Sequence, residues 1–145
     1  MSAKLVVGLD GSGSGQRAVA HAKRLANLIG DCELVLLYVI EWSPFTFQTA
    51  EENEQRHKRR EEEITAATTR VVEPAVTEVK AGGFKVRGLV RHGDVADLLN
   101  RTATEEGAEQ IIVARTSETG IASRIFGSST ANLVMSATVP VTVVS

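Results

Sequence analysis

The stretch KLVVGLDGSGSG, residues 4–15, contains the pattern that decides the fold. Its first half, Lys4–Leu9, is a short apolar run rich in β-branched residues, which is typical of a buried strand. Its second half, Asp10–Gly15, is a polar loop of Asp, Gly and Ser residues, and apolar residues at helical spacing follow from Ala18 onward. A strand, a glycine-rich turn and a helix in this order predict the first unit of a parallel α/β sheet.

The same alternation continues to the end of the chain. Four further runs have strand character: Glu33–Ile40, Phe84–Val90, Gln110–Val113 and Val139–Val144. Apolar stripes at helical spacing separate them, over residues 18–29, 64–79, 95–103 and 131–135. We therefore expect one Rossmann-like, doubly wound α/β domain over residues 1–145. Its five-stranded parallel sheet is expected in the order 3-2-1-4-5, with helices on both faces.

Composition narrows the class of protein. Sixteen basic against 18 acidic residues give a formal net charge of −2, which removes the electrostatic argument for nucleic acid or an anionic membrane surface. The longest apolar run, Leu34–Ile40, is far shorter than the roughly 20 residues of a membrane helix. Cys32 is the single cysteine and cannot form an internal disulfide. We expect a cytoplasmic protein that binds neither nucleic acid nor membrane.

A run of charges, EENEQRHKRREEE at residues 51–63, precedes the second helical stripe. Opposite charges recur four residues apart, as in Glu52/Arg56 and Lys58/Glu62, and each such pair stabilises an exposed helix by about 0.2–0.5 kcal/mol. The mixed signs favour a solvated helical extension over a nucleic-acid patch. Pro74 lies between the residues of the second apolar stripe but not on the stripe itself, and it predicts a kink or a helix restart.

Polar loops follow the first and the fourth expected strand. The order 3-2-1-4-5 places the ends of these two strands side by side, and open parallel sheets bind ligands in the crevice that forms there. The loop after the fourth strand begins at Ala114 and leads to Gly127-Ser128-Ser129-Thr130. Glycine lets a backbone approach a ligand, and hydroxyls with free N–H groups at a helix N-terminus suit a phosphate. A purely structural alternative stays open, in which Ser128 only caps the helix.

Three motifs, in their order and spacing, resemble the universal stress protein family. They are Val7-Gly8-Leu9-Asp10-Gly11-Ser12 after the first strand, Gly93-Asp94 at the start of the third helix, and Ala114-x2-Ser117-x9-Gly127-Ser128 near the end. The closing strand Val139–Val144 also fits, so the resemblance extends over nearly the whole chain. The nucleotide-binding branch of that family has glycines at the first two positions of the last motif, where this chain has Ala114 and Ser117.

The resemblance implies a site for ATP, with any Mg²⁺ held mainly by phosphate oxygens. Asp10 would contact the ribose or adenine side, and Val39 would meet the adenine. The full implied set of nucleotide-binding residues is Gly8, Asp10, Val39, Val113, Ala114, Ser117, Gly127, Ser128 and Ser129. Because Ala114 and Ser117 each add a Cβ that the motif lacks, the alternative is a family member that has lost nucleotide binding and acts as a dimeric interaction or regulatory module.

The resemblance also implies a role in stress response and a homodimer formed through Val139–Val144. The last strand of a 3-2-1-4-5 sheet lies at an edge, and an unprotected edge can pair with a second chain. Pro140 removes one hydrogen-bond donor near the start of this strand and blunts the edge only partly.

No arrangement of catalytic residues stands out in the sequence. The chain has no Gly-Lys-[Ser/Thr] of a P-loop, and three residues separate the first strand from Gly13, where a dinucleotide motif would begin at once. Ser12 stands where phosphatases of the haloacid dehalogenase type carry a second aspartate. His21, His57 and His92 are not at metal-ligand spacing. We therefore expect a binding protein without a dedicated metal site, and at most slow ATP hydrolysis.

Overall fold

The five strands of the computed structural model form one parallel sheet in the order β3-β2-β1-β4-β5, as expected from the sequence. The structure describes the backbone of residues 2–11, 13–41, 50–115 and 121–145. The strands are β1 (Ala3–Leu9), β2 (Cys32–Glu41), β3 (Lys85–Gly93), β4 (Gln110–Ala114) and β5 (Val141–Val144). β1 lies at the centre and pairs with β2 on one side and with β4 on the other. The expected fold class is confirmed.

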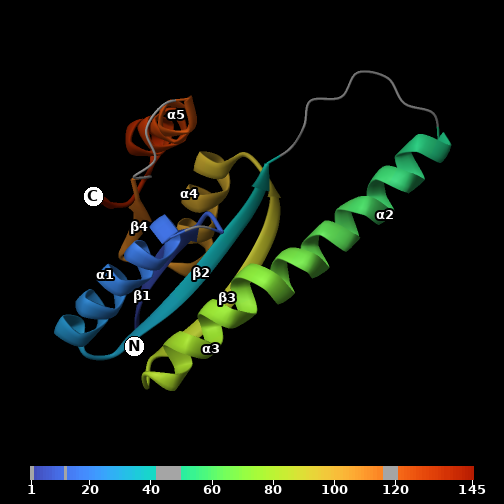
Figure 1. Cartoon of the computed structure of the whole chain (residues 1–145). Coiled ribbons are helices and arrows are strands. Elements are labelled where there is room, and N and C mark those ends of the chain that lie inside the picture. Colours follow the sequence, from blue (N-terminus) through green and yellow to red (C-terminus); the bar gives the residue numbers. More distant parts are fainter. Residues whose placement is uncertain (1, 12, 42–49, 116–120) are drawn as a thin grey trace.

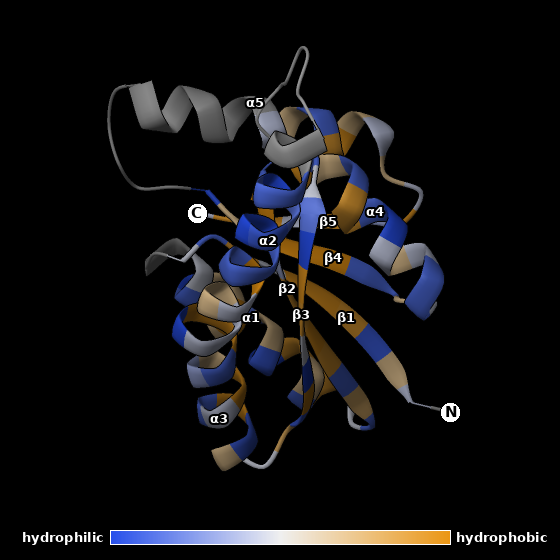
Figure 2. Ribbon diagram, turned by 90° about the vertical axis from the view of Figure 1, so that its right-hand side faces the viewer, coloured by the Kyte–Doolittle hydropathy of each residue, from blue (hydrophilic) through white to orange (hydrophobic). Residues whose placement is uncertain are grey.

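Helices cover both faces of this sheet (Figures 1 and 2). The helices α1 (Gly13–Ile29) and α3 (Glu73–Ala81) pack on one face. The helices α4 (Val95–Glu106) and α5 (Ile121–Ser136) pack on the other. Figure 2 shows the apolar strand residues concentrated in the layer between the two sets of helices.

The central strands are buried on both faces, which explains why their sequences are continuous apolar runs. In β1, Leu5 and Val7 belong to the core under α1, whereas Val6 belongs to the core under α4. The buried face of α1 carries the small residues Ala18, Ala22 and Ala26, each of which is at most 3% exposed. These alanines let α1 lie close to the sheet, so the turn that joins it to β1 is fixed in place.

The second crossover is one long, nearly continuous helical rod (Figure 1). It consists of α2 (Ala50–Ala67), the π-helical turn η1 (Thr68–Val72) and α3. At a rise of roughly 1.5 Å per residue the rod spans about 48 Å, so the N-terminal half of α2 extends past the strands. Most residues from 54 to 63 are exposed, as expected of a solvated extension. None of the described helices combines the length and the apolar composition that crossing a membrane requires.

The π-helical turn explains how the rod accommodates Pro74. A π turn inserts one extra residue into a helix. Pro74 then falls in the first turn of α3, where its missing N–H is not needed. The insertion also changes which residues face the sheet, because Val72 and Val79 are buried there while Val71 is only partly buried. The helix does not end and restart at Pro74; the irregularity associated with this proline is the π turn that precedes it.

Gly88 of β3 provides the surface on which this turn rests. A Cβ at residue 88 would lie 2.2 Å from Val72 Cγ1 and 2.9 Å from Val76 Cγ2. Such separations do not occur between carbon atoms in folded proteins, so only glycine lets η1 and α3 pack at this depth.

The start of α4 is fixed by the motif Gly93-Asp94. The Asp94 side chain accepts a hydrogen bond from the N–H of Asp97 at 2.9 Å and caps the helix. Gly93 has φ +153°, and a Cβ there would lie 2.8 Å from Leu98 Cδ1. This entry orients α4 so that Val95 and Leu99 line a cleft at the carboxyl ends of the strands.

His92, at the end of β3, is packed beneath α2. Its side chain is 11% exposed, and Nε2 lies 3.4 Å from Glu63 Oε2 of α2. Burial lowers the pKa of the His92 imidazole below its ordinary value of 6.5, and the positive charge of Arg60 lowers it further, whereas Glu63 acts in the opposite direction.

We predict that Gly88→Ala lowers the free energy of unfolding by about 1–3 kcal/mol, the usual cost of overpacking a core. Urea unfolding followed by circular dichroism measures the loss. Gly82→Ala is the matched control, because a Cβ there meets its nearest neighbours at an ordinary 3.4 Å. The double variant Gly88→Ala/Val72→Ala should recover part of the loss, and a loss of equal size in all three proteins would contradict this packing.

We also predict that His92 makes stability fall in weak acid. Because its pKa is lower in the folded protein than in the unfolded chain, its contribution is complete above pH 6.5 and declines as the pH falls through that value toward the folded pKa. Asp31 and Glu106 have pKa values below their ordinary 3.8 and 4.5, so their contributions are lost only at more acidic pH.

The measurement compares urea midpoints at pH 7.5 and 5.5. The difference should shrink in His92→Phe and persist in His57→Gln, a change at an exposed histidine of α2. An unchanged difference in His92→Phe would show that this histidine is not responsible.

Candidate functional site

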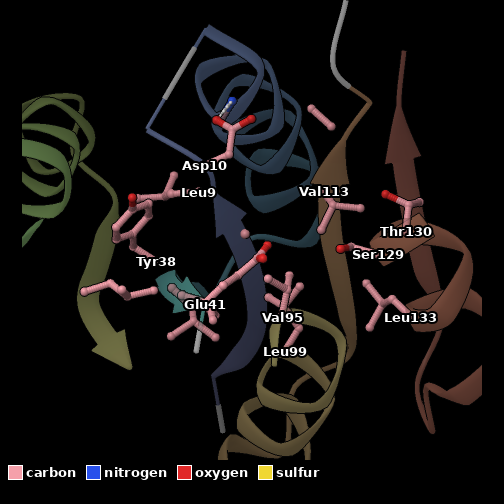
Figure 3. Close-up of a pocket in the computed structure, with 16 residues that line it drawn as sticks. Leu9, Asp10, Tyr38, Glu41, Val95, Leu99, Val113, Ser129, Thr130 and Leu133 are labelled. Atoms are coloured by element: carbon pink, nitrogen blue, oxygen red, sulfur yellow. Dashed lines mark hydrogen bonds between the residues drawn. The ribbon is translucent and has the colours of Figure 1, made fainter. Parts of the chain in front are cut away.

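A cleft of about 470 Å³ lies at the carboxyl ends of β1, β2 and β4, and α4 and α5 contribute to its wall (Figure 3). We call it the carboxyl-end cleft. It is lined by Gly8, Leu9, Asp10, Gly15, Leu37, Tyr38, Val39, Ile40, Glu41, Val95, Leu99, Val113, Ala114, Ser129, Thr130 and Leu133. Its position matches the crevice expected beyond the ends of the first and fourth strands.

The structure brings most of the expected nucleotide-binding residues together in this cleft. Those that line it are Gly8, Asp10, Val39, Val113, Ala114 and Ser129. Ser117 lies outside the described residues. Gly127 and Ser128 lie within α5, and their side chains are outside the description.

One wall of the cleft is apolar and closely packed. Val113 of β4 and Leu99 of α4 approach the backbone of Gly8, so that a Cβ on Gly8 would lie 3.1 Å from Val113 Cγ1 and 3.4 Å from Leu99 Cδ2. Leu133 of α5 is 1% exposed and extends the same wall. Figure 3 shows Val113, Leu99 and Leu133 on one side of the cleft, away from Asp10.

The turn after β1 holds the Asp10 carboxylate at the opposite side. Asp10 Oδ1 accepts a hydrogen bond from the N–H of Gly15 at 3.2 Å (Figure 3). Gly11 has φ +79°, a conformation that favours glycine, and it lets the chain reverse between β1 and α1. A side chain at Gly15 would place its Cβ 3.2 Å from the same carboxylate oxygen. The two glycines therefore position Asp10 without covering it.

A second carboxylate, that of Glu41, extends from the end of β2 toward the middle of the cleft (Figure 3). Among the described residues that line the cleft, the charged side chains are Asp10 and Glu41, and both are acidic. The cleft therefore favours hydrogen-bond donors such as hydroxyl and amino groups.

The sequence analysis missed Glu41 as a site residue, although a signal was available. Side chains at alternate positions of a strand share one face. Leu37 and Val39 belong to the core under α4, and Glu41 follows at the same spacing. All three line the cleft, as do Tyr38 and Ile40 between them. The expected contact of Val39 with a ligand could therefore have been extended to both neighbours. Tyr38 and Leu133 were also missed, and their places depend on how β2 and α5 pack.

The start of α5 differs from the expectation. The apolar stripe at residues 131–135 predicted a short helix beginning near Gly127, but α5 begins at Ile121. Gly127 to Thr130 therefore lie inside the helix, where backbone N–H groups bond to carbonyls one turn earlier. These residues are therefore not at the N-terminus of α5, where the sequence analysis expected them. The Ser129 and Thr130 side chains, which line the cleft, remain available as hydroxyl donors.

A second hollow of about 370 Å³ lies between α1 and the π turn, and we call it the α1–α3 groove. Lys23, Arg70 and Glu78 contribute its charged lining. It shares Leu9 and Gly15 with the carboxyl-end cleft but contains none of the expected nucleotide-binding residues. The carboxyl-end cleft is therefore the candidate site.

Metal-binding groups do not gather in the described part of the chain. Among those residues, no three His, Cys, Asp or Glu side chains lie where they could share one ion. His92 does not line the cleft and packs against α2 instead. Cys32 is buried, and burial raises the pKa of its thiol above the ordinary value, which disfavours the thiolate form.

Comparison with known proteins agrees with this geometry. The whole chain, residues 1–145, matches the model of the universal stress protein family. No curated protein matches the sequence.

Several solved structures share the fold over nearly their full length. The hypothetical protein MJ0577 is 25% identical with a TM-score of 0.78, and the match covers 99% of this chain and 96% of that one. A universal stress protein solved with cAMP is 24% identical with a TM-score of 0.63, covering 99% and 96%. The universal stress protein of Archaeoglobus fulgidus solved with dAMP is 16% identical with a TM-score of 0.61, covering 100% and 98%.

Proposed function

The chain belongs to the universal stress protein family, and on this premise we propose that its carboxyl-end cleft binds an adenine nucleotide. The observation that carries the proposal is an apolar wall facing the Asp10 carboxylate at the end of β1. A purine needs apolar surface for its faces, and a ribose offers hydroxyl donors to a carboxylate. The volume of about 470 Å³ lies within the roughly 300–1,000 Å³ of small-molecule sites. The neighbours solved with cAMP and dAMP support the adenine class.

The cleft residues suggest how the nucleotide is oriented. We place the adenine against Val39, Val113 and Leu99, and the ribose hydroxyls at Asp10. The phosphates then lie toward Ala114 and the hydroxyls of Ser129 and Thr130, where the sequence motif also contributes Ser117, Gly127 and Ser128. Mg²⁺ would accompany ATP on the phosphate oxygens, since the described residues provide no ligand cluster of their own.

This role is binding rather than catalysis. Among the described residues, the polar side chains that line the cleft carry hydroxyl or carboxylate groups. No histidine, cysteine or lysine is among these lining residues. A nucleophile activated by a neighbouring base is not assembled there. We therefore propose slow ATP hydrolysis at most, and a cytoplasmic stress-response role for one α/β domain over residues 1–145.

A second candidate is a family member that has lost nucleotide binding and serves as a dimeric interaction or regulatory module. Two observations favour it. Ala114 and Ser117 replace motif glycines, and the backbone N–H groups of Gly127 and Ser128 lie within α5. Direct titration with nucleotides separates the two candidates.

We also propose a homodimer through the edge strand, at residues 139–144. β5 pairs with β4 on one side, which leaves its other side as the edge of the sheet. On β5 itself, the side chain of Val143 is 41% exposed. Exposed apolar side chains beside an open edge favour association with a second copy.

We predict that wild-type protein binds AMP or ATP in calorimetric titration and that Asp10→Asn binds about tenfold more weakly. Asparagine keeps an acceptor for the N–H of Gly15 but removes the charge that strengthens a hydrogen bond from a ribose hydroxyl. Glu109→Gln is the control. Glu109 is exposed just before the amino end of β4, whereas the cleft lies at the carboxyl ends of the strands. Absence of heat from wild type at millimolar nucleotide would contradict the proposal and favour the interaction module.

For the dimer we predict that Val143→Arg shifts the sedimenting species from dimer to monomer at micromolar concentration. An arginine at this position would place two charges in the interface between the edge strands. Leu28→Arg is the matched control, because Leu28 is 82% exposed on α1 and is not part of the edge strand. A wild-type monomer, or a Val143→Arg dimer, would contradict assembly through this edge.

A further inference from the structure

Arg17 of α1 reaches across the carboxyl end of the sheet to β4. Its guanidinium Nη2 donates a hydrogen bond to the carbonyl oxygen of Arg115. Arg115 directly follows Ala114, which lines the carboxyl-end cleft, and its N–H donates to the carbonyl of Val144 at 2.7 Å. The backbone of Arg115, which accepts the hydrogen bond from Arg17, is therefore fixed in position by its own hydrogen bond to β5. On its own helix, Arg17 lies two residues after Gly15, another lining residue. Arg17 does not line the cleft itself, but its guanidinium is held at Arg115, the residue that follows the lining residue Ala114.

The negative charge of the described lining residues makes the position of the Arg17 guanidinium important. The charged lining side chains among the described residues are Asp10 and Glu41, and neither of these carboxylates attracts a phosphate. The N–H groups of Gly127 to Thr130 lie within α5 and do not compensate for these charges. Each further phosphate of a nucleotide adds negative charge, so a cationic side chain near the outer phosphates strengthens the binding of a di- or triphosphate more than that of a monophosphate.

The present partner of Arg17 is a weak one for a guanidinium. A backbone carbonyl is neutral, whereas a phosphate oxygen is charged, and charge-assisted hydrogen bonds are about twice as strong as neutral ones. A guanidinium has five N–H donors in a planar fork, so donors remain for a phosphate while one keeps its bond to Arg115. Arg17 can therefore bind a phosphate without releasing β4.

We propose that Arg17 is a specificity residue of the cleft that recognises the outer phosphates of a nucleoside di- or triphosphate. A monophosphate, with its single phosphate at Ser129 and Thr130, does not reach it. Arg17 thus sets the preference of the site for ATP or ADP over AMP. This inference rests on the proposed nucleotide binding in the same cleft.

The test is a calorimetric titration of wild type, Arg17→Gln and Arg17→Lys with AMP and with ATP. Arg17→Gln should weaken ATP binding about tenfold and AMP binding less than twofold. Arg17→Lys keeps the charge but not the fork and should fall between wild type and Arg17→Gln. Arg24→Gln, an exposed arginine of the same helix, is the control and should change neither affinity.

The outcomes separate this inference from the proposed function. Equal weakening of AMP and ATP in Arg17→Gln would mean that Arg17 only holds β4 in place, and no change would mean that it does not touch phosphate; either result overturns the inference. Wild type that binds AMP but not ATP also overturns it while leaving the adenine-nucleotide site intact. Wild type that binds neither nucleotide overturns the proposed function itself. Retained AMP binding in Arg17→Gln shows that the variant is folded.

Discussion

The structure depends on one constraint, the burial of β1 on both faces between two parallel neighbours. Its apolar residues alternate between the core under α1 and the core under α4, so the strand cannot shift by one residue without exchanging the two sets. β2 and β4 pair with β1 on its two sides. After β1 the chain turns toward one face of the sheet to form α1, and after β4 it turns toward the other face to form α5. The space where those directions diverge is the carboxyl-end cleft. The position of Asp10, directly after β1, follows from the same constraint.

Around that centre the molecule uses small residues wherever two elements approach closely. The alanines of α1 let it lie near the sheet, Gly88 receives the π turn, and Gly8 forms part of the cleft wall against Val113. The π turn has a structural role, because its extra residue turns Val72 toward β3 and places Pro74 in the first turn of α3. The charged half of α2 then extends past the sheet as a solvated helix (Figure 1).

Most of the fold could be predicted from the sequence, because strands buried on both faces are short apolar runs whose order restricts the topology. Asp10, Val39 and Val113 were predicted for the site from the resemblance to the universal stress protein family, and all three line the cleft at the carboxyl ends of the strands. The start of α5 could not be predicted in this way. Gly127, Ser128 and Ser129 are poor helix formers, and tertiary packing decides their conformation. Glu41 was predictable from the alternation in β2, whereas Arg17 became visible only when α1 and β4 were placed together.

The central claim is that an adenine nucleotide occupies the carboxyl-end cleft rather than the α1–α3 groove. Amide chemical shifts recorded by NMR during titration with AMP test it most directly, because each hollow has its own lining residues. The account predicts that the largest shifts occur at Asp10, Val39, Val113 and Ser129, with little change at Arg70, Val71 and Glu78. Shifts concentrated at Arg70, Val71 and Glu78, or no shifts at saturating nucleotide, would contradict it.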